Sequence, residues 1–99
     1  MRVEFRTNAL QKHYEQSTKA IRAYGPDVGR RYIQRVNILK NSADKAAVMA
    51  QKTLRCHPLT GDRKGEYAIQ LTGQARLIVT FGTCFEGVRS EEVSKHYDD

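Results

Sequence analysis

The chain has 99 residues, of which 39% are apolar and 28% charged, and its formal net charge is +6. This length predicts one domain, 1–99, and the composition is typical of a folded chain rather than a disordered one. No apolar stretch reaches the roughly 18 residues that a membrane helix needs, and Met1–Arg6 lacks the apolar core of a secretory signal. Because two cysteines are too few for a disulfide framework, we expect a cytoplasmic protein.

The positive charge is unevenly distributed along the chain. Residues 1–50 contain ten basic and four acidic side chains and therefore carry the whole net charge, whereas residues 51–99 contain seven of each. A net-basic domain is attracted to polyanions such as nucleic acids. The same charge can also serve only to keep a surface soluble.

The first half of the chain predicts a strand followed by helices. Apolar and charged residues alternate over Met1–Arg6, which indicates a half-buried strand. Thr7 or Asn8 can then cap a helix over 8–24, in which one mostly apolar stripe recurs every three or four residues. Its members are Leu10, Tyr14, Ser17, Ile21 and Tyr24.

A second and a third helix are expected after the pair Gly25-Pro26. Glycine suits the end of one helix and proline the first turn of the next, and a stripe from Val28 to Leu39 continues the pattern. Two helices joined by so short a turn should pack as an antiparallel hairpin. Ser42 can cap a short third helix that runs to about Gln51.

The second half of the chain predicts strands. Residues 52–66 have no regular period and contain Pro58, Gly61 and Gly65, so we expect a loop or an irregular sheet edge. Residues 67–71 and 75–81 are rich in β-branched and aromatic side chains and should form a hairpin. A last strand is expected over 87–95. Which of its side chains face the core is unclear, because Val88 and Val93 are an odd number of residues apart and would point to opposite faces of a regular strand.

The register of that hairpin determines where Arg76 points. A three-residue turn pairs Leu71 with Ala75 and Ile69 with Leu77, which makes one face wholly apolar. A two-residue turn would bury Arg76 on that apolar face, at a cost of several kcal/mol. The first register is therefore favoured, and it directs Arg76 out of the face that the helices leave uncovered.

The order strand, helices and then strands predicts an α+β domain, in which an N-terminal strand and a helical hairpin pack on one face of a small antiparallel sheet. The sequence contains no phosphate-binding loop, dinucleotide fingerprint or nucleophile elbow. Its three histidines are far apart and its cysteines lack ligand spacing, so neither a metal nor another cofactor is expected. A nucleophilic pair of Cys56 and His57 is disfavoured because adjacent side chains diverge in extended backbone.

Titratable and basic side chains gather in the second half of the chain. The loop 54–67 contains Arg55, His57, Arg63 and Lys64 and lies next to the strand that leads to Arg76, while Lys95, His96 and Tyr97 lie near the end. RNA carries its own nucleophile, the 2′-hydroxyl, so proton carriers and cations can cleave it without a metal. Histidine suits the proton transfers and arginine suits the phosphate.

At this point the sequence resembles a known family. The string from His57 to Tyr67, HPLTGDRKGEY, followed by Arg76-Leu-Ile-Val and by Lys95-His-Tyr97, is similar to the HigB branch of the RelE/ParE toxin superfamily. The resemblance covers nearly the whole chain and implies a RelE-like, microbial-RNase-like sheet. It also implies a type II toxin that cleaves mRNA on the ribosome and is neutralised by a HigA-like helix-turn-helix antitoxin. Operator DNA would be bound only through that antitoxin.

The resemblance also implies roles for particular residues. His57 corresponds to the loop histidine, a candidate general base, and Arg76 to the strand arginine that holds the scissile phosphate. HigB-type chains typically end in aspartate, tyrosine and histidine, whereas this one reads Lys95-His96-Tyr97, so either His96 or Tyr97 could be the general acid. We expect phosphate contacts from Arg55, Arg63, Lys64 and Lys95.

Two other functions remain open from the sequence. A ParE-like toxin that inhibits DNA gyrase by contact would share the fold and the basic charge, but it would need neither the loop histidine nor the C-terminal pair. A plain RNA-binding module would show strongly salt-dependent binding without toxicity. The basic helical residues Arg30, Arg31 and Arg35 could contact ribosomal RNA or simply be solvated.

Overall fold

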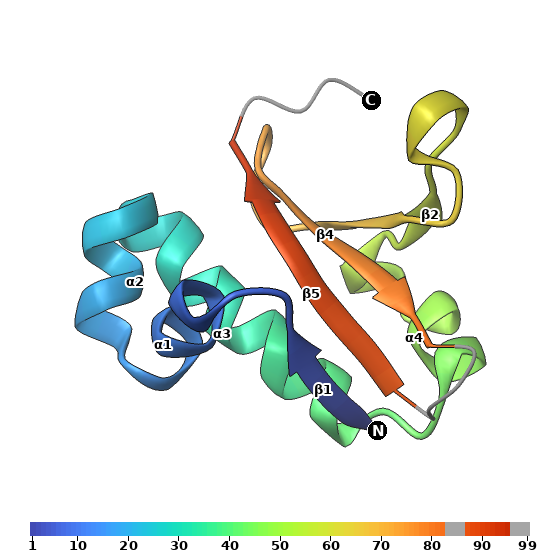
Figure 1. The fold of residues 1–99 in the computed structure, drawn as a ribbon, viewed down its shortest axis with the longest axis horizontal. Helices are drawn as coiled ribbons and strands as arrows, with labels where there is room; N and C mark the ends of the chain where they lie inside the picture. Colours follow the sequence, from blue (N-terminus) through green and yellow to red (C-terminus); the bar gives the residue numbers. More distant parts are fainter. Residues whose placement is uncertain (83–86, 96–99) are drawn as a thin grey trace.

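The computed structural model describes residues 1–82 and 87–95, and their arrangement confirms the α+β class (Figure 1). Two single-turn 3-10 helices, Lys52–Leu54 and Gly61–Arg63, interrupt the segment that was expected to be irregular. The helices are α1 (Asn8–Glu15), α2 (Ser17–Tyr24), α3 (Pro26–Asn41) and α4 (Lys45–Ala50). The strands are β1 (Arg2–Phe5), β2 (His57–Pro58), β3 (Tyr67–Gln70), β4 (Arg76–Phe81) and β5 (Gly87–Ser94).

The single helix expected over 8–24 is wrong, because Gln16 divides it into α1 and α2. Gln16 has extended backbone angles (φ −128°, ψ 104°), and its carbonyl accepts hydrogen bonds from the first turn of α2. The apolar stripe continues across this break, so the sequence pattern gives no sign of it. The two helices have different neighbours: α1 contacts both β1, where Tyr14 stacks on Phe5 with ring centroids 5.7 Å apart, and α3, whereas α2 packs mainly on α3.

The expected helical hairpin is confirmed for α2 and α3. Gly25 ends α2 with a φ of +89°, which favours glycine. Gly29 then lets the two helices approach closely, because a Cβ atom there would lie 2.8 Å from the Ala20 carbonyl carbon. This contact fixes α2 across the N-terminal half of α3.

The fourth helix begins later than expected. Asp44, not Ser42, is its N-cap, and the Asp44 Oδ1 accepts a 2.9 Å hydrogen bond from the Ala47 N–H. Ser42 instead ends α3, and its hydroxyl donates to the Ile38 carbonyl at 2.7 Å. Serine and aspartate both occur at helix ends. The sequence alone therefore did not show which of the two residues ends α3 and which begins α4.

The described strands form one sheet in the order β1-β5-β4-β3-β2. The expectation of a wholly antiparallel sheet is wrong at one edge, where β1 runs parallel to β5. The other pairs are antiparallel, and the favoured hairpin register is confirmed: Ile69 pairs with Leu77 and Gln70 with Arg76.

A β-bulge in β5 explains the unclear phase of the last strand. Ile78 pairs with Glu92 but Val79 pairs with Ser90, so Glu91 is an extra residue in the ladder. The bulge shifts the alternation by one residue. As a result Val88 lies in the core cluster and Val93 packs against it, although one position number is even and the other odd.

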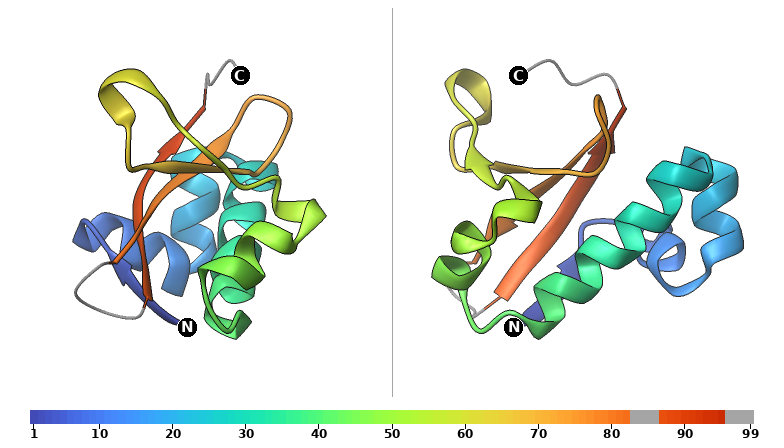
Figure 2. Two further views of the ribbon diagram at one scale, coloured as in Figure 1. Left: turned by 90° about the vertical axis from the view of Figure 1, so that its right-hand side faces the viewer. Right: turned by 180° about the vertical axis from the view of Figure 1, so that it is seen from behind.

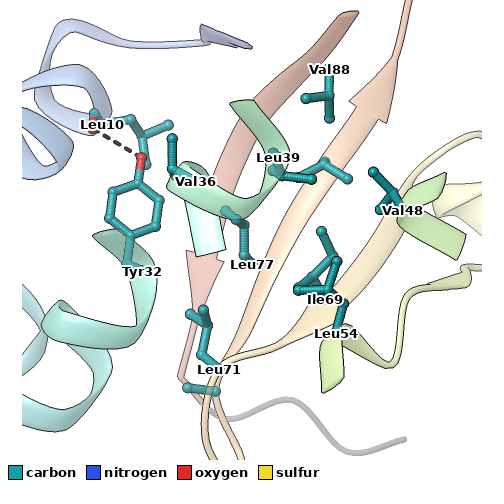
Figure 3. Close-up of a cluster of buried hydrophobic side chains, with 12 residues drawn as sticks. Leu10, Tyr32, Val36, Leu39, Val48, Leu54, Ile69, Leu71, Leu77 and Val88 are labelled. Carbon is teal, nitrogen blue, oxygen red and sulfur yellow. Dashed lines mark hydrogen bonds between the residues drawn. The ribbon is translucent and has the colours of Figure 1, made fainter. Parts of the chain in front are cut away.

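The main core fills the space between the sheet and the helices (Figure 3). Figure 2 shows α1, α2 and α3 gathered on one side of β5. The Tyr32 side chain is fully buried there, its hydroxyl donates to the Leu10 carbonyl at 2.9 Å, and burial raises the pKa of this phenol. The residues around it include Val36, Leu39, Val48, Leu54, Ile69, Leu77, Val79 and Val88. A second, smaller cluster of Leu59, Ala68 and Ile78 is separate from it.

Candidate active site

The outer face of the sheet, which is turned away from α1–α3, contains both main candidates for catalysis. We define this face by the side chains that alternate away from the main core: His57, Ala68, Gln70, Arg76, Ile78, Thr80, Arg89 and Glu92. Paired residues of neighbouring strands share a face. His57 pairs with Ala68, Ala68 with Ile78, and Arg76 lies two residues before Ile78. Strand geometry therefore separates the Cα atoms of His57 and Arg76 by about 12 Å.

The His57 ring is oriented by the backbone of its own loop. Its Nδ1 lies 3.0 Å from the Arg55 carbonyl oxygen, which can only accept, so Nδ1 carries the hydrogen in this contact. In the neutral ring the lone pair is then on Nε2. Arg55 adopts a left-handed conformation (φ 48°), unlike the other non-glycine residues in the described ranges. This conformation turns the carbonyl toward the ring.

Arg76 lies on the expected face, but it is buried there rather than exposed. The residue is only 6% exposed. Its Nη1 donates to three carbonyl oxygens of the β3–β4 turn: Thr72 at 2.8 Å, Ala75 at 3.0 Å and Gly73 at 3.2 Å. The Ala75 carbonyl also accepts from the Leu71 N–H across the hairpin, whereas the Thr72 and Gly73 carbonyls lie in the turn, where the guanidinium folds back to bond them. The group is therefore fixed in place over the turn.

Arg63 reaches across the outer face and forms ion pairs. Its Nη2 donates to Glu66 Oε1 at 2.8 Å and also contacts a Glu92 carboxylate oxygen on β5. These two carboxylates raise the pKa of the Arg63 guanidinium. The segment that contains Arg63 thus covers part of this face, with Leu59 packed on Ala68 and Ile78. A phosphate group at Arg63 would have to compete with both carboxylates.

A second ion cluster surrounds the bulged residue Glu91, which is 8% exposed. Its Oε2 accepts from the Thr80 hydroxyl at 2.6 Å and from Arg89 Nε at 2.7 Å, while its backbone carbonyl accepts from Arg6. The carboxylate of Glu91 also raises the pKa of Arg89. Sequence reasoning missed both Glu91 and Glu92, because their placement depends on the bulge. The opposite parity of Val88 and Val93 was the signal that could have revealed it.

The other predicted site residues are not all brought together. Arg55 and Lys64 are exposed and belong to the segment that carries His57. Lys95 lies elsewhere, because its Nζ donates to the Ala23 carbonyl on α2 at 3.4 Å. His96 and Tyr97 lie outside the described residues, so their part in the site stays a prediction.

The described residues offer little for metal or thiol chemistry. Within 1–82 and 87–95, no three His, Cys, Asp or Glu side chains lie together in a way that could hold a metal ion. Burial raises the pKa of Cys56 to about 11, so its thiol is protonated at neutral pH and is a poor nucleophile. None of the helices described is long and apolar enough to cross a bilayer.

Comparison with solved structures identifies the fold. A YoeB/ParE toxin from Agrobacterium tumefaciens superimposes with a TM-score of 0.65 at 14% sequence identity, covering 98% of this chain and 100% of that one. A YoeB-YefM complex from Staphylococcus aureus gives 0.61 at 15% identity, covering 98% of each chain. YafQ from E. coli strain BL21(DE3) gives 0.65 at 16% identity, covering 95% of this chain and 91% of that one. No protein-family model and no curated protein sequence matches the chain.

The chain therefore has the fold of the RelE/ParE-type toxins over nearly its whole length. This confirms the fold that the resemblance implied. The neighbours are YoeB and YafQ proteins, so assignment to the HigB branch in particular stays a prediction.

Proposed function

We propose that this protein is the toxin of a type II toxin–antitoxin system and that it cleaves mRNA on the ribosome without a metal. The observation that carries the proposal is the shared outer face of His57 and Arg76 in a fold of this type. A proton acceptor and a fixed cation on one face are the minimum that cleavage by the ribose 2′-hydroxyl requires.

In this mechanism, His57 Nε2 removes the proton of the 2′-hydroxyl. The freed oxygen attacks the adjacent phosphorus, and the bond from phosphorus to the 5′-oxygen breaks, leaving a 2′,3′-cyclic phosphate. His96 or Tyr97 donates a proton to the departing 5′-oxygen. The hydrogen bond from His57 Nδ1 to the Arg55 carbonyl supports this assignment, because it favours the tautomer with a basic Nε2.

Arg76 stabilises the negative charge that develops on the phosphate. Its Nη1 is held by the turn carbonyls, which fixes the guanidinium before substrate binds. The phosphate exchanges with part of the present contacts of Arg76 when RNA enters. Arg55, Arg63, Lys64 and Lys95 remain candidates for contacts to flanking phosphates, with Arg63 first having to leave its carboxylate partners.

The proposal extends to partners and location. The protein acts in the cytoplasm, and a HigA-like helix-turn-helix antitoxin neutralises it and brings the pair to operator DNA. The likeness to a YoeB-YefM complex supports a toxin of this fold acting with an antitoxin. Neither a membrane nor a metal is involved.

The decisive experiment compares two histidine variants by primer extension on mRNA in translating ribosomes. His57→Gln should lower the cleavage rate by about 100-fold to 10,000-fold, the range for removing a general base. His13→Gln is the matched control, because His13 lies on α1 and contacts Tyr24 rather than the outer face. Equal activity of His57→Gln and the unaltered protein would refute the assignment of the base.

Arg76 needs two variants, because it also holds the β3–β4 turn. Arg76→Ala should lose about 100-fold to 1,000-fold in cleavage rate, as removal of one electrostatic donor does. Arg76→Lys keeps a charge and a donor for the turn, so its circular dichroism should match that of the unaltered protein while its cleavage stays impaired. Full cleavage by a folded Arg76→Lys would show that the reaction does not require a guanidinium at this position.

One structural neighbour is described as a YoeB/ParE toxin, so the gyrase alternative is tested in parallel. A ParE-like function would leave mRNA intact and inhibit supercoiling of a plasmid by DNA gyrase. It would also tolerate His57→Gln. That pair of results would replace the nuclease proposal.

A further inference from the structure

A basic groove lies beside α3 and reaches the end of β3 and the turn that follows it. It encloses ≈600 Å³ between the N-terminal half of α3, the 3-10 turn Lys52–Leu54 and the end of β3. Three arginines and one aspartate line it, which gives the lining a net charge of +2. The polar lining residues on which the argument depends are Asp27, Arg30, Arg31, Arg35, Thr53 and Thr72.

Arg35 is the unusual member of this groove. The residue is only 3% exposed, and its Nε donates to the Gln70 carbonyl at 3.0 Å while Nη1 donates to Gln34 Oε1 at 3.2 Å. In the part of the chain that the structure describes, no carboxylate pairs with Arg35 or with its neighbours Arg30 and Arg31. Burial and the neighbouring charge of Arg31 lower the pKa of Arg35. A buried cation without a counter-ion is costly, and an anion in the groove would reduce that cost.

The groove and the candidate active site share one structural element. Arg35 bonds the carbonyl of Gln70, the last residue of β3, and Arg76 bonds the carbonyl of Thr72 in the turn that follows. The guanidinium of Arg35, from α3, and that of Arg76, from β4, thus contact adjoining parts of the hairpin. A strand of nucleic acid that passes the turn would have one phosphate near each of them.

We propose that the groove beside α3 is a second phosphate-binding site, which takes a backbone phosphate of single-stranded nucleic acid next to the segment bound on the outer face. The inference rests on the proposed function for the identity of the ligand, although phosphate binding itself does not require cleavage. Phosphate fits this lining better than a carboxylate does. Its additional oxygens can accept from more than one arginine fork and from threonine hydroxyls at once.

The first arm of the test detects phosphate directly. The full-length ¹⁵N-labelled protein is titrated with inorganic phosphate, and the NMR signals of Arg35 Nε–H and of the Gln70 and Thr72 amides are followed. We expect these three signals to shift together and to saturate. No shift of Arg35 Nε–H on addition of phosphate would overturn the proposal.

The second arm measures binding of a labelled oligodeoxythymidylate of about ten nucleotides, a length within the usual range of single-strand sites. This probe has no 2′-hydroxyl, so it cannot be cleaved, and a failure of the nuclease proposal does not affect the result. Arg31→Glu should weaken binding by about tenfold or more, because it removes a charged hydrogen bond and adds repulsion. It should also reduce the dependence of log K on log salt by about 0.7 for each phosphate that the variant no longer binds.

Arg22→Glu is the matched control, because Arg22 is exposed on α2, does not line the groove and changes the net charge by the same amount. It should keep the full salt dependence, and an equal loss in Arg22→Glu would overturn the proposal by showing attraction to overall charge. Arg35→Met replaces the buried cation by an apolar side chain of similar length and should abolish the phosphate-induced shifts at Gln70 and Thr72. A polyglutamate peptide that displaces the oligonucleotide at equal concentration would instead assign the groove to an acidic protein segment.

Discussion

The two faces of the sheet differ in the interactions that their side chains make. The inner face packs against the helices through fully buried side chains such as Leu77 and Val79, with the Tyr32 hydroxyl satisfied inside the core. The outer face has a cluster of three apolar residues, and its cations Arg63 and Arg89 are paired with carboxylates. The inner face thus stabilises the fold mainly by burying apolar side chains, whereas the outer face holds charged side chains in fixed positions.

The contrast also shows where the positive charge is available. On the outer face Arg63 and Arg89 are paired with carboxylates, whereas the groove beside α3 holds three arginines and one aspartate. A ligand with phosphates therefore meets Arg63 and Arg89 already paired with carboxylates over the sheet, whereas the arginines beside α3 have no carboxylate partner among the described residues. This distribution is the reason that we expect the groove to contribute more to binding affinity and the outer face more to chemistry.

The largest expected effect on the free energy of unfolding is a difference between two neighbouring residues of β4. Leu77 and Ile78 are both fully buried but point to opposite faces (Figure 3 shows Leu77 in the main core). Leu77→Ala should cost about 3 to 5 kcal/mol of unfolding free energy and Ile78→Ala about 2 kcal/mol, because the cavity under a loop can collapse more easily than one under helices. Urea denaturation followed by circular dichroism measures both. Equal losses would show that the outer cluster is as tightly packed as the main core.

A smaller loss of stability is expected from disturbing the contact between α2 and α3. Gly29→Ala should destabilise the protein by about 1 to 3 kcal/mol, because the new Cβ would meet the Ala20 backbone at 2.8 Å, although alanine favours helices by about 1 kcal/mol. Gly73→Ala is the control, since a Cβ there meets no atom within 4 Å. Thermal denaturation compares the two variants. An unchanged melting temperature for Gly29→Ala would mean that the helix pair can separate without cost.

Sequence reasoning recovered the inner face more completely than the outer one. Hydrophobic periodicity predicted the hairpin register of Ile69 with Leu77 and the helical stripes, because burial selects apolar residues at a fixed spacing. It also placed Arg76 on the correct face. The parallel pairing of β1 with β5 and the break at Gln16 were missed, because both depend on contacts between residues far apart in the chain.

The candidate site was predictable as a set of residue types but not as a set of contacts. The hairpin register placed Arg76 on the correct face and the family resemblance grouped His57 with it, yet neither could show that Arg76 folds onto its own turn. Nor could it show that Arg63 is paired with Glu92, because that contact requires both the loop over the sheet and the bulge. Ion pairs between segments far apart in the chain are formed only once the fold is in place, and no periodic sequence pattern indicates them.

The smallest expected effect on stability concerns the ion pair between Arg63 and Glu92 on the outer face. Glu92→Gln removes one carboxylate partner of Arg63, and both side chains of this pair are 40% exposed. Partly exposed ion pairs contribute below about 1 kcal/mol, so the unfolding free energy should change little. Affinity for the oligodeoxythymidylate should instead rise by about two- to fivefold, because one more positive charge on the outer face is unneutralised.

Glu15→Gln provides the matched control for this charge change, since Glu15 is exposed on α1 and contacts Gln11. Both variants raise the net charge equally, so a larger gain in affinity for Glu92→Gln measures the local effect on Arg63. Equal gains would mean that phosphates do not approach Arg63 and that its ion pairs serve only to hold the loop. A loss of several kcal/mol in Glu92→Gln would mean that the outer face, like the inner one, contributes mainly to stability.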